Sequence, residues 1–578
     1  MPARTGTAHV VTTTRTYKDR VYRTHLLRRS YREGGTVKNE TLGNLSHLPE
    51  ALVDLIRRAL QGETFVPLGQ AFEISRSRAQ GHVHAVTTAM QRLGFSSLIV
   101  AKPCRERDLV LAMVASRIVN PQTKLATTRT WHTTTLAEDF AVADASEDDL
   151  YAAMDWLLSH QDRIEKKLAA RHLREGGLVL YDLSSSYFEG TTCPLAKRGY
   201  NRDGKHGLLQ VNYGLLTDGR GCPVAVSVHE GNTSDSTTFL PEVQRLRTAF
   251  GIEHLVMIGD RGMISQKAID AMRENEGVDW ITALKSGSIR ALIEQRQLQL
   301  GLFDERNLFE FSAPDYPGER LVACRNAPLA KLRAHKREAL LCATEKRLEK
   351  IKARVAAARL TGQDAIGVCV GKVVNQYKVS KHFELVIDEA AFSFRRKPDS
   401  IAAEAALDGI YIIRTSIAAT HMSEADCVRN YKSLANVERA FRSFKTIDLK
   451  VRPIHHRLSD RVRSHIFLCL LAYYVEWHMR EAWRELMFAD ADQQAKAVRD
   501  PVAPATRSEA TLTKVARHTL DDDTPVHSFA TLMAELATIA RNTCRTPTAP
   551  ADAPSFEILT TANPKQRRAI ELLQQISA

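Results

Sequence analysis

Two aspartates lie in short apolar stretches that predict buried strands. Asp182 is in LVLYDLSSS, and Asp260 is in HLVMIGDRGMIS, where it ends the stretch. A carboxylate at the end of a buried strand costs free energy unless it is paired or binds a metal ion. If the strands are neighbours in one sheet, both carboxylates converge at one end, where open α/β sheets bind ligands. The alternative is that each aspartate caps the turn or helix that follows it.

A third acid, Glu438, lies in YKSLANVERAFRSFK, within a helix predicted from about residue 423 to 445. Tyr431, Glu438 and Lys445 are seven residues apart, so they share one stripe of a continuous helix, and Arg442 lies on the same side. A plain surface ion pair is the alternative interpretation of this glutamate. Three carboxylates can share two hard divalent ions about 4 Å apart, an arrangement that suits phosphodiester cleavage.

The composition favours a polyanionic partner. The chain has 578 residues, 44% hydrophobic residues and a formal net charge of +13. Lysine and arginine neutralise phosphates and release counterions, although solvated basic faces are a common alternative. The length predicts several domains with sizeable cores.

Cysteine usage and apolar runs predict a cytoplasmic protein without a membrane partner. The nine cysteines are scattered, and no two have the CxxC spacing of a zinc site, which is typical of reduced thiols. The start of the chain lacks the apolar core of a signal peptide. The longest apolar run, Ile466 to Val475, is too short to span a bilayer and predicts a buried helix.

Hydrophobic periodicity predicts an α/β protein. In 176–285 the elements follow the order β, β, β, α, β, α, β, and this segment is the first part of a core that 407–490 completes. The other predicted regions are a strand-rich segment at 1–48, a helical region at 49–175, an insertion at 286–406 and a helical tail at 491–578.

The insertion carries a long basic helix, Leu329 to Leu360, with ten Lys or Arg against three Glu. One interpretation is that this helix binds a polyanion or a second subunit. The alternative is a solvated helix or a coiled-coil arm. The stretch that follows, GVCVGKVVNQYKVSKHFELVIDEAAFSF, is predicted to form strands, so the insertion is expected to be β-rich.

Several of these motifs together resemble a known family. YDLSSSYFEG, GDRG after an apolar strand, and ERAFRSFK followed by RPIHHR resemble bacterial insertion-sequence transposases of the DDE superfamily. They resemble more narrowly the group whose third acid lies in a Tyr-Arg-Glu-Lys signature helix. The resemblance covers about residues 176–480. It implies a ribonuclease H-like catalytic core with a β-rich insertion, Mg²⁺ or Mn²⁺ dependence, and action on terminal inverted repeats by a homodimer on DNA.

Carried over by position, the resemblance implies that Asp182, Asp260 and Glu438 are the catalytic and metal-binding acids. Tyr431 and Lys445 match the signature's tyrosine and lysine, whereas Leu434 stands where the signature has arginine. That phosphate contact is then absent, or it comes from one of three nearby basic residues, Lys432, Arg439 and Arg442. The complete predicted DNA-binding set is Tyr431, Arg442, Lys445, Arg452, His455 and Arg457.

The preferred interpretation is a transposase that cleaves and joins DNA ends and is associated with the nucleoid when bound. The helical region 49–175 is its predicted end-binding part. A nuclease of the same fold without strand transfer is one alternative. A non-catalytic DNA-binding derivative is the other, but it would need a lost acid, and all three acids are present.

Overall fold

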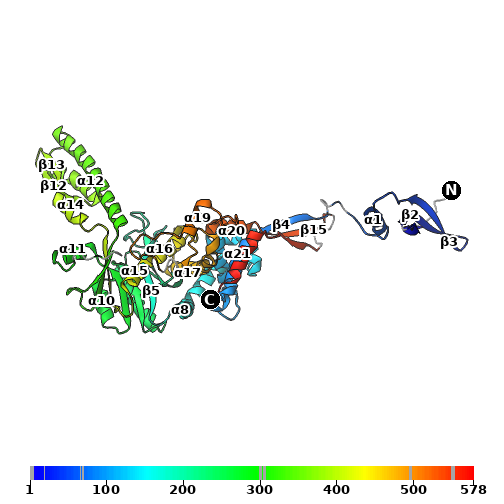
Figure 1. The fold of residues 1–578 in the computed structure, drawn as a ribbon, viewed down its shortest axis with the longest axis horizontal. Helices are drawn as coiled ribbons and strands as arrows, with labels where there is room; N and C mark the ends of the chain where they lie inside the picture. Colours follow the sequence, from blue (N-terminus) through cyan, green and yellow to red (C-terminus); the bar gives the residue numbers. More distant parts are fainter. Residues whose placement is uncertain are drawn as a thin grey trace. The chain divides into compact units, whose positions relative to one another are not determined.

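The computed structural model describes residues 6–18, 20–65, 67, 71–298, 303, 307–493, 498–547 and 554–577. The chain forms two compact units, each described here by itself. The first consists of Met1–Ser77 and Asn542–Leu559, and the second of Arg78–Arg541 and Thr560–Ala578. Figure 1 shows the elements of both units. No helix in the described ranges is long and apolar enough to cross a membrane.

The first unit is built mainly from strands. The antiparallel sheet β1 (Thr7–Tyr17), β2 (Arg20–Glu33) and β3 (Thr36–Asn44) is followed by α1 (Glu50–Leu60). A second sheet has the order β16 (Phe556–Leu559), β15 (Ala540–Arg545), β4 (Glu73–Ala79). The predictions of helix throughout 49–175 and of a purely helical tail are therefore wrong at β4, β15 and β16. β4 and β15 are neighbours in this sheet although they lie near opposite ends of the chain, and such pairing has no local signal.

Helices dominate the first part of the second unit, as predicted for this stretch. They are α2 (Gly81–Arg92), α3 (Phe95–Ile99), α4 (Arg105–Val119), α5 (Lys124–Thr130), α6 (Leu136–Asp139), α7 (Glu147–Ser159) and α8 (Gln161–His172). They pack around α17 (Ser459–Ala482), which contacts α2, α4 and α7. The apolar run from Ile466 to Val475 is buried within α17, so the predicted buried helix is confirmed. After α17 follow α19 (Glu509–Arg517), α20 (Phe529–Ala537) and α21 (Pro564–Gln574).

An eight-stranded mixed sheet forms the other half of this unit, and the predicted α/β class is confirmed. Its order is β10-β11-β14-β9-β8-β5-β6-β7. The strands are β5 (Gly177–Tyr187), β6 (Gln210–Asp218), β7 (Pro223–Glu230), β8 (Leu255–Ile258), β9 (Val278–Ala283), β10 (Leu308–Phe311), β11 (Arg320–Arg325) and β14 (Ile410–Thr415). Between them lie α9 (Asp235–Thr248), α10 (Gln266–Arg273) and α11 (Ser286–Glu294). β5 is central, parallel to β8 and antiparallel to β6.

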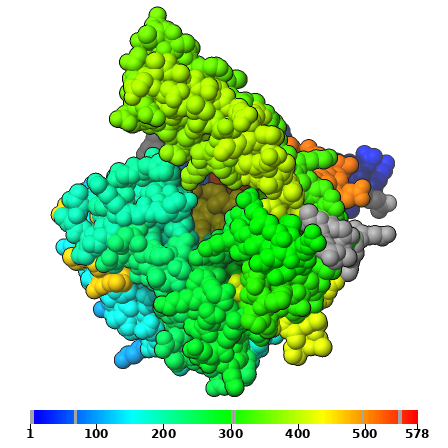
Figure 2. All heavy atoms as spheres, turned by 90° about the vertical axis from the view of Figure 1, so that its left-hand side faces the viewer, coloured from blue at the N-terminus to red at the C-terminus, as the bar shows by residue number. Residues whose placement is uncertain are grey.

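The insertion is mostly helical, so the prediction of a β-rich insertion is wrong. Its arm consists of α12 (Ala327–Ala356), α13 (Gln363–Tyr377), β12 (Phe383–Ile387), β13 (Phe392–Arg396) and α14 (Pro398–Ala405). The stretch predicted as strands begins with α13, because Ile366, Val370 and Val374 form a helical stripe that packs into the arm's own core. β10 and β11, also in the predicted insertion, extend the main sheet. Figure 2 shows a hollow below the arm, bordered by teal and green segments.

The predicted continuous helix at 423–445 is broken. It consists of α15 (Glu424–Lys432), α16 (Leu434–Arg442) and the π-helical turn η5 (Ser443–Ile447). α15 packs against β9, β11 and β14, whereas α16 packs against β5. Because each half follows a different part of the sheet, tertiary packing determines the break near Ser433.

Candidate active site

The pairing of β5 with β8 brings the two aspartates together. The strands are parallel, and Leu180 pairs with Ile258. Asp182 and Asp260 each lie two residues beyond this last pair, so they stand at the same level of neighbouring strands. β8 ends just before Asp260, as predicted, but β5 continues to Tyr187. Asp182 is therefore in the middle of its strand, not at its end.

The third acid approaches from α16. This helix buries Val437, Ala440 and Phe441 and leaves Glu438 exposed on its other side. The charges of Asp260 and Glu438 both act on the Asp182 carboxyl. The structure thus brings the three predicted acids into one electrostatic neighbourhood, although their carboxylate oxygens do not all lie within 4.8 Å of one another.

The environment of this acid triad suits cations. Burial raises the pKa of Asp182 to about 7, the backbone N–H of Leu183 and the charge of Arg202 oppose the rise, and the other two carboxylates add to it. Among the described residues, no Lys, Arg or His side chain forms an ion pair with any of the three acids. Hard oxygen donors of this kind suit Mg²⁺ or Mn²⁺. A pair of ions about 4 Å apart also bridges a wider set of carboxylates than a single ion does.

Tyr431 lies near the second aspartate. Burial raises the pKa of this tyrosine, and the negative charge of Asp260 adds to the rise. Asp260 also accepts a hydrogen bond of 2.7 Å from the backbone N–H of Arg261. Tyr431, whose side chain the sequence predicts to contact DNA, therefore lies within electrostatic range of an acid of the triad.

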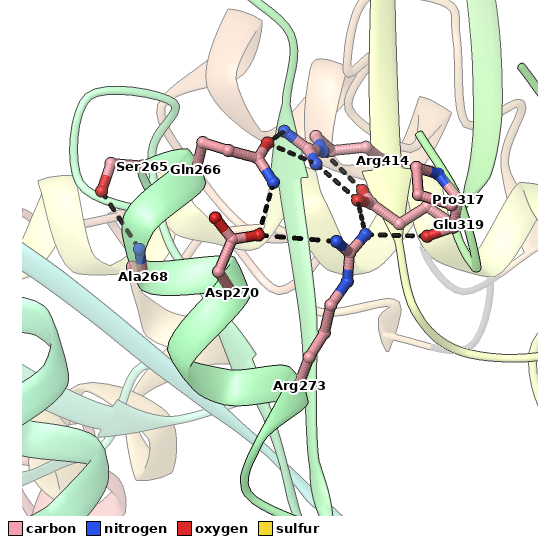
Figure 3. Close-up of polar contacts among 8 residues, drawn as sticks. All are labelled: Ser265, Gln266, Ala268, Asp270, Arg273, Pro317, Glu319 and Arg414. Carbon is pink, nitrogen blue, oxygen red and sulfur yellow. Dashed lines mark hydrogen bonds and ion pairs between the residues drawn. The ribbon is translucent and has the colours of Figure 1, made fainter. Parts of the chain in front are cut away.

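A buried ionic network anchors the helix that follows Asp260. Ser265 caps α10, and Gln266 on its first turn bonds Arg414 of β14. Glu319, with its side chain fully buried, binds both Arg414 at 2.5 Å and Arg273 of α10 at 2.6 Å (Figure 3). These contacts hold both ends of α10 in place. The turn that leads from Asp260 into α10 therefore ends at a fixed position.

Two of the predicted DNA-binding residues converge on an acid that sequence reasoning missed. Lys445 in η5 binds the Asp203 carboxylate at 3.0 Å, and Arg452 forms an ion pair with the same carboxylate. Asp203 has only 2% of its side chain exposed and also accepts a hydrogen bond of 3.1 Å from the backbone N–H of Tyr187. Lys445 and Arg452 thus both bind Asp203. The predicted single helical stripe that joins Lys445 to Tyr431 is not formed, because the helix is broken between them.

Three of the predicted DNA-binding residues lie around one pocket. Arg452, His455 and Arg457 border a pocket of about 600 Å³. Among the described residues that line it are six lysines and arginines and no Asp or Glu: Arg117, Lys124, Lys450, Arg452, Arg457 and Arg461. Arg117 and Lys124 come from the helical region, and no pattern in the sequence linked them to the RPIHHR segment. Arg442 is exposed at the end of α16.

The three basic residues that could replace the phosphate contact of the signature's arginine differ in their surroundings. Lys432 donates to the backbone carbonyls of Val502 and Ala503, at 3.1 Å each, so its ammonium group is already engaged. Arg439 and Arg442 are both exposed on α16, the helix that carries Glu438.

Comparisons with known proteins identify the family. Residues 178–475 match the family described as transposase DDE domain, and residues 10–66 match the N-terminal domain of the IS1634 family of transposases. No curated protein matches. Among solved structures, a cryo-EM structure of the piggyBac transposase synaptic complex with hairpin DNA is 10% identical, with a TM-score of 0.33, over 76% of this chain and 85% of that one. The first of these matches spans half of the chain and includes all three acids, so the chain belongs to the DDE transposases, and more narrowly to those of insertion sequences.

Proposed function

We propose that this transposase cleaves and joins phosphodiester bonds at the terminal inverted repeats of its element, with Asp182, Asp260 and Glu438 holding two divalent ions. The observation that carries the proposal is the parallel register of β5 and β8, with Glu438 acting on the same neighbourhood. The strand order β7-β6-β5-β8-β9, with β6 antiparallel to its neighbours, supports the ribonuclease H-like core that the resemblance implies.

The chain's own residues have distinct roles in this proposal. When bound, the two ions would activate the attacking oxygen and stabilise the leaving one. Asp182 and Asp260 would hold the first ion, Glu438 would complete the second, and Tyr431 would support Asp260 from nearby. Mg²⁺ is the expected ion, and Mn²⁺ is expected to replace it because both prefer oxygen ligands.

DNA phosphates are the proposed ligands of the basic residues around the acids. Arg452, His455 and Arg457 line a pocket without acidic side chains, and Arg442 lies exposed at the end of α16. Lysine and arginine at such a surface release counterions when they neutralise phosphates. Because two element ends must be joined, we expect two copies of the chain on DNA.

The test is a strand-transfer assay with a labelled 3′-OH end and Mg²⁺ in the reaction. The full chain should give both cleaved and joined products. Asp260→Asn should lower both by at least about a thousandfold while DNA binding persists. Glu274→Gln, which removes an exposed acid just after α10, is the matched control and should keep full activity.

Two outcomes would redirect the proposal. Cleavage without any joined product would make the chain a nuclease of the same fold. Undiminished cleavage by Asp260→Asn would remove this aspartate from the site.

A further inference from the structure

A second group of metal-ligand side chains lies where three elements of the second unit meet. His172 ends α8, Cys222 lies in the turn between β6 and β7, and His478 lies in α17. One ligand atom from each of the three residues lies within 4.8 Å of the other two, and the Cys222 Sγ is 3.9 Å from Nε2 of His478. None of these residues belongs to the acid triad.

The cluster is largely buried and its rings are held in place. Cys222 is fully buried and His478 is 8% exposed, whereas His172 is half-buried. The Tyr474 hydroxyl lies 3.0 Å from Nε2 of His172, and the two imidazole rings are tilted by 46° with centroids 5.7 Å apart. A neighbouring polar group that orients a histidine ring is a regular feature of metal sites in proteins.

We propose that His172, Cys222 and His478 bind one zinc ion, or another divalent ion that favours sulfur and nitrogen. One thiolate and two imidazoles suit zinc, whereas the hard Mg²⁺ expected at the acid triad prefers oxygen. Zinc bond lengths of about 2.0–2.3 Å place tetrahedral ligands about 3.5 Å apart. The ligand atoms therefore need to close by roughly 1 Å, which side-chain rotations supply.

Charged groups of both signs surround the cluster. Binding converts the Cys222 thiol to a thiolate and releases its proton to solvent, while both imidazoles bind as neutral groups. The ion and the thiolate together carry one positive charge. The negative charge of Asp218 acts on both His172 and Cys222, and its carboxylate accepts a hydrogen bond of 2.9 Å from the Cys222 N–H. The positive charge of Arg220 acts on the same two residues.

A route for the ion and room for a fourth ligand lie on the solvent side. His172, His478 and Glu481 line a pocket of about 660 Å³, whose other charged lining residues are Glu485 and four arginines: Arg171, Arg174, Arg220 and Arg484. Water from this pocket completes the tetrahedral coordination. The ion would fasten the end of α8 and the β6–β7 turn to α17. Its proposed role is structural, because no residue of the cluster belongs to the acid triad, and β6 pairs directly with the strand that carries Asp182.

Cobalt substitution in the untagged full-length protein tests this site. Cobalt bound by a thiolate has an intense near-ultraviolet charge-transfer band, which carboxylate ligands of the acid triad do not produce. The wild type should bind about one equivalent of zinc by elemental analysis and show this band with Co²⁺. Cys222→Ser should lose the band, whereas Cys324→Ser, the matched control at another fully buried cysteine, should keep it.

The wild-type spectrum can refute the proposal even if Cys222→Ser fails to fold. A wild type without the band, or a folded Cys222→Ser that keeps it, would overturn the proposal. His172→Gln, at the half-buried ligand, is a second variant and should weaken Co²⁺ binding by at least about tenfold. A chelator should lower the melting temperature of the wild type and of Cys324→Ser but not that of Cys222→Ser.

Discussion

Asp203 is the residue whose replacement tests the geometry of the site most directly. Its carboxylate holds Lys445 and Arg452 together, and the substitution Asp203→Asn removes the charge while it keeps the shape. We predict a less stable protein that cleaves DNA more slowly but binds DNA at least as well. Asp203 is a positioning residue in this prediction, because it acts through the two basic side chains.

The magnitude follows from burial. Removing one partner of a buried ion pair costs about 3–5 kcal/mol, because a charge is left without compensation. The side chains of Lys445 and Arg452 are 11% and 22% exposed, so solvent relieves part of this cost. We therefore expect the free energy of unfolding to fall by about 2–3 kcal/mol. With both basic groups no longer fixed, cleavage should slow by about 10- to 100-fold.

DNA binding should move in the opposite direction. The substitution makes the net charge more positive by one, and Lys445 and Arg452 are then no longer neutralised by Asp203. Non-specific affinity should therefore stay the same or rise, with a salt dependence steeper by about one phosphate contact. This divergence between binding and cleavage separates a positioning role from general unfolding.

Three measurements on the same preparation check this prediction: urea denaturation, single-turnover cleavage, and DNA binding between about 50 and 200 mM salt. Glu349→Gln on α12 is the control, because it changes the charge equally at an exposed position outside the site. Unchanged stability and cleavage in Asp203→Asn would refute the reasoning, and so would a loss of DNA affinity.

Further predictions concern stability, pH and the second aspartate. Burial lowers the pKa of Lys124 to about 7, so protonation below its unfolded pKa favours the unfolded chain. Lys124→Met should therefore raise the free energy of unfolding above that of the wild type, by at most about 5 kcal/mol at pH 7. The difference should shrink as the pH approaches 10. The exposed control Lys350→Met should show no such pH dependence. Glu319→Gln should lower the free energy of unfolding by about 3–5 kcal/mol in urea denaturation, because two arginines lose a buried partner; an unchanged midpoint would contradict the network. Tyr431→Phe should slow single-turnover cleavage about tenfold, because it removes the polar hydroxyl near Asp260, and an equal loss of DNA binding would assign the hydroxyl to DNA instead.

Local patterns were sufficient for the main elements of the catalytic region. The apolar stretches around Asp182 and Asp260 predict strands, because a buried strand needs an almost continuous run of apolar side chains. The same reasoning predicts the buried part of α17 and the α/β class. Glu438 was identified only through its motif, since an acid between basic residues is ordinary on a helix surface.

Only the tertiary structure decided which distant residues meet. The pairing of Lys445 and Arg452 with Asp203, and the meeting of Lys124 with the RPIHHR segment, join parts of the chain that share no periodicity. The break near Ser433 also depends on what α15 and α16 pack against. Hydrophobic spacing reports which side of an element is buried, but it does not report the partner. The residues that surround the acids were therefore determined by packing between elements and could not be read from any one of them.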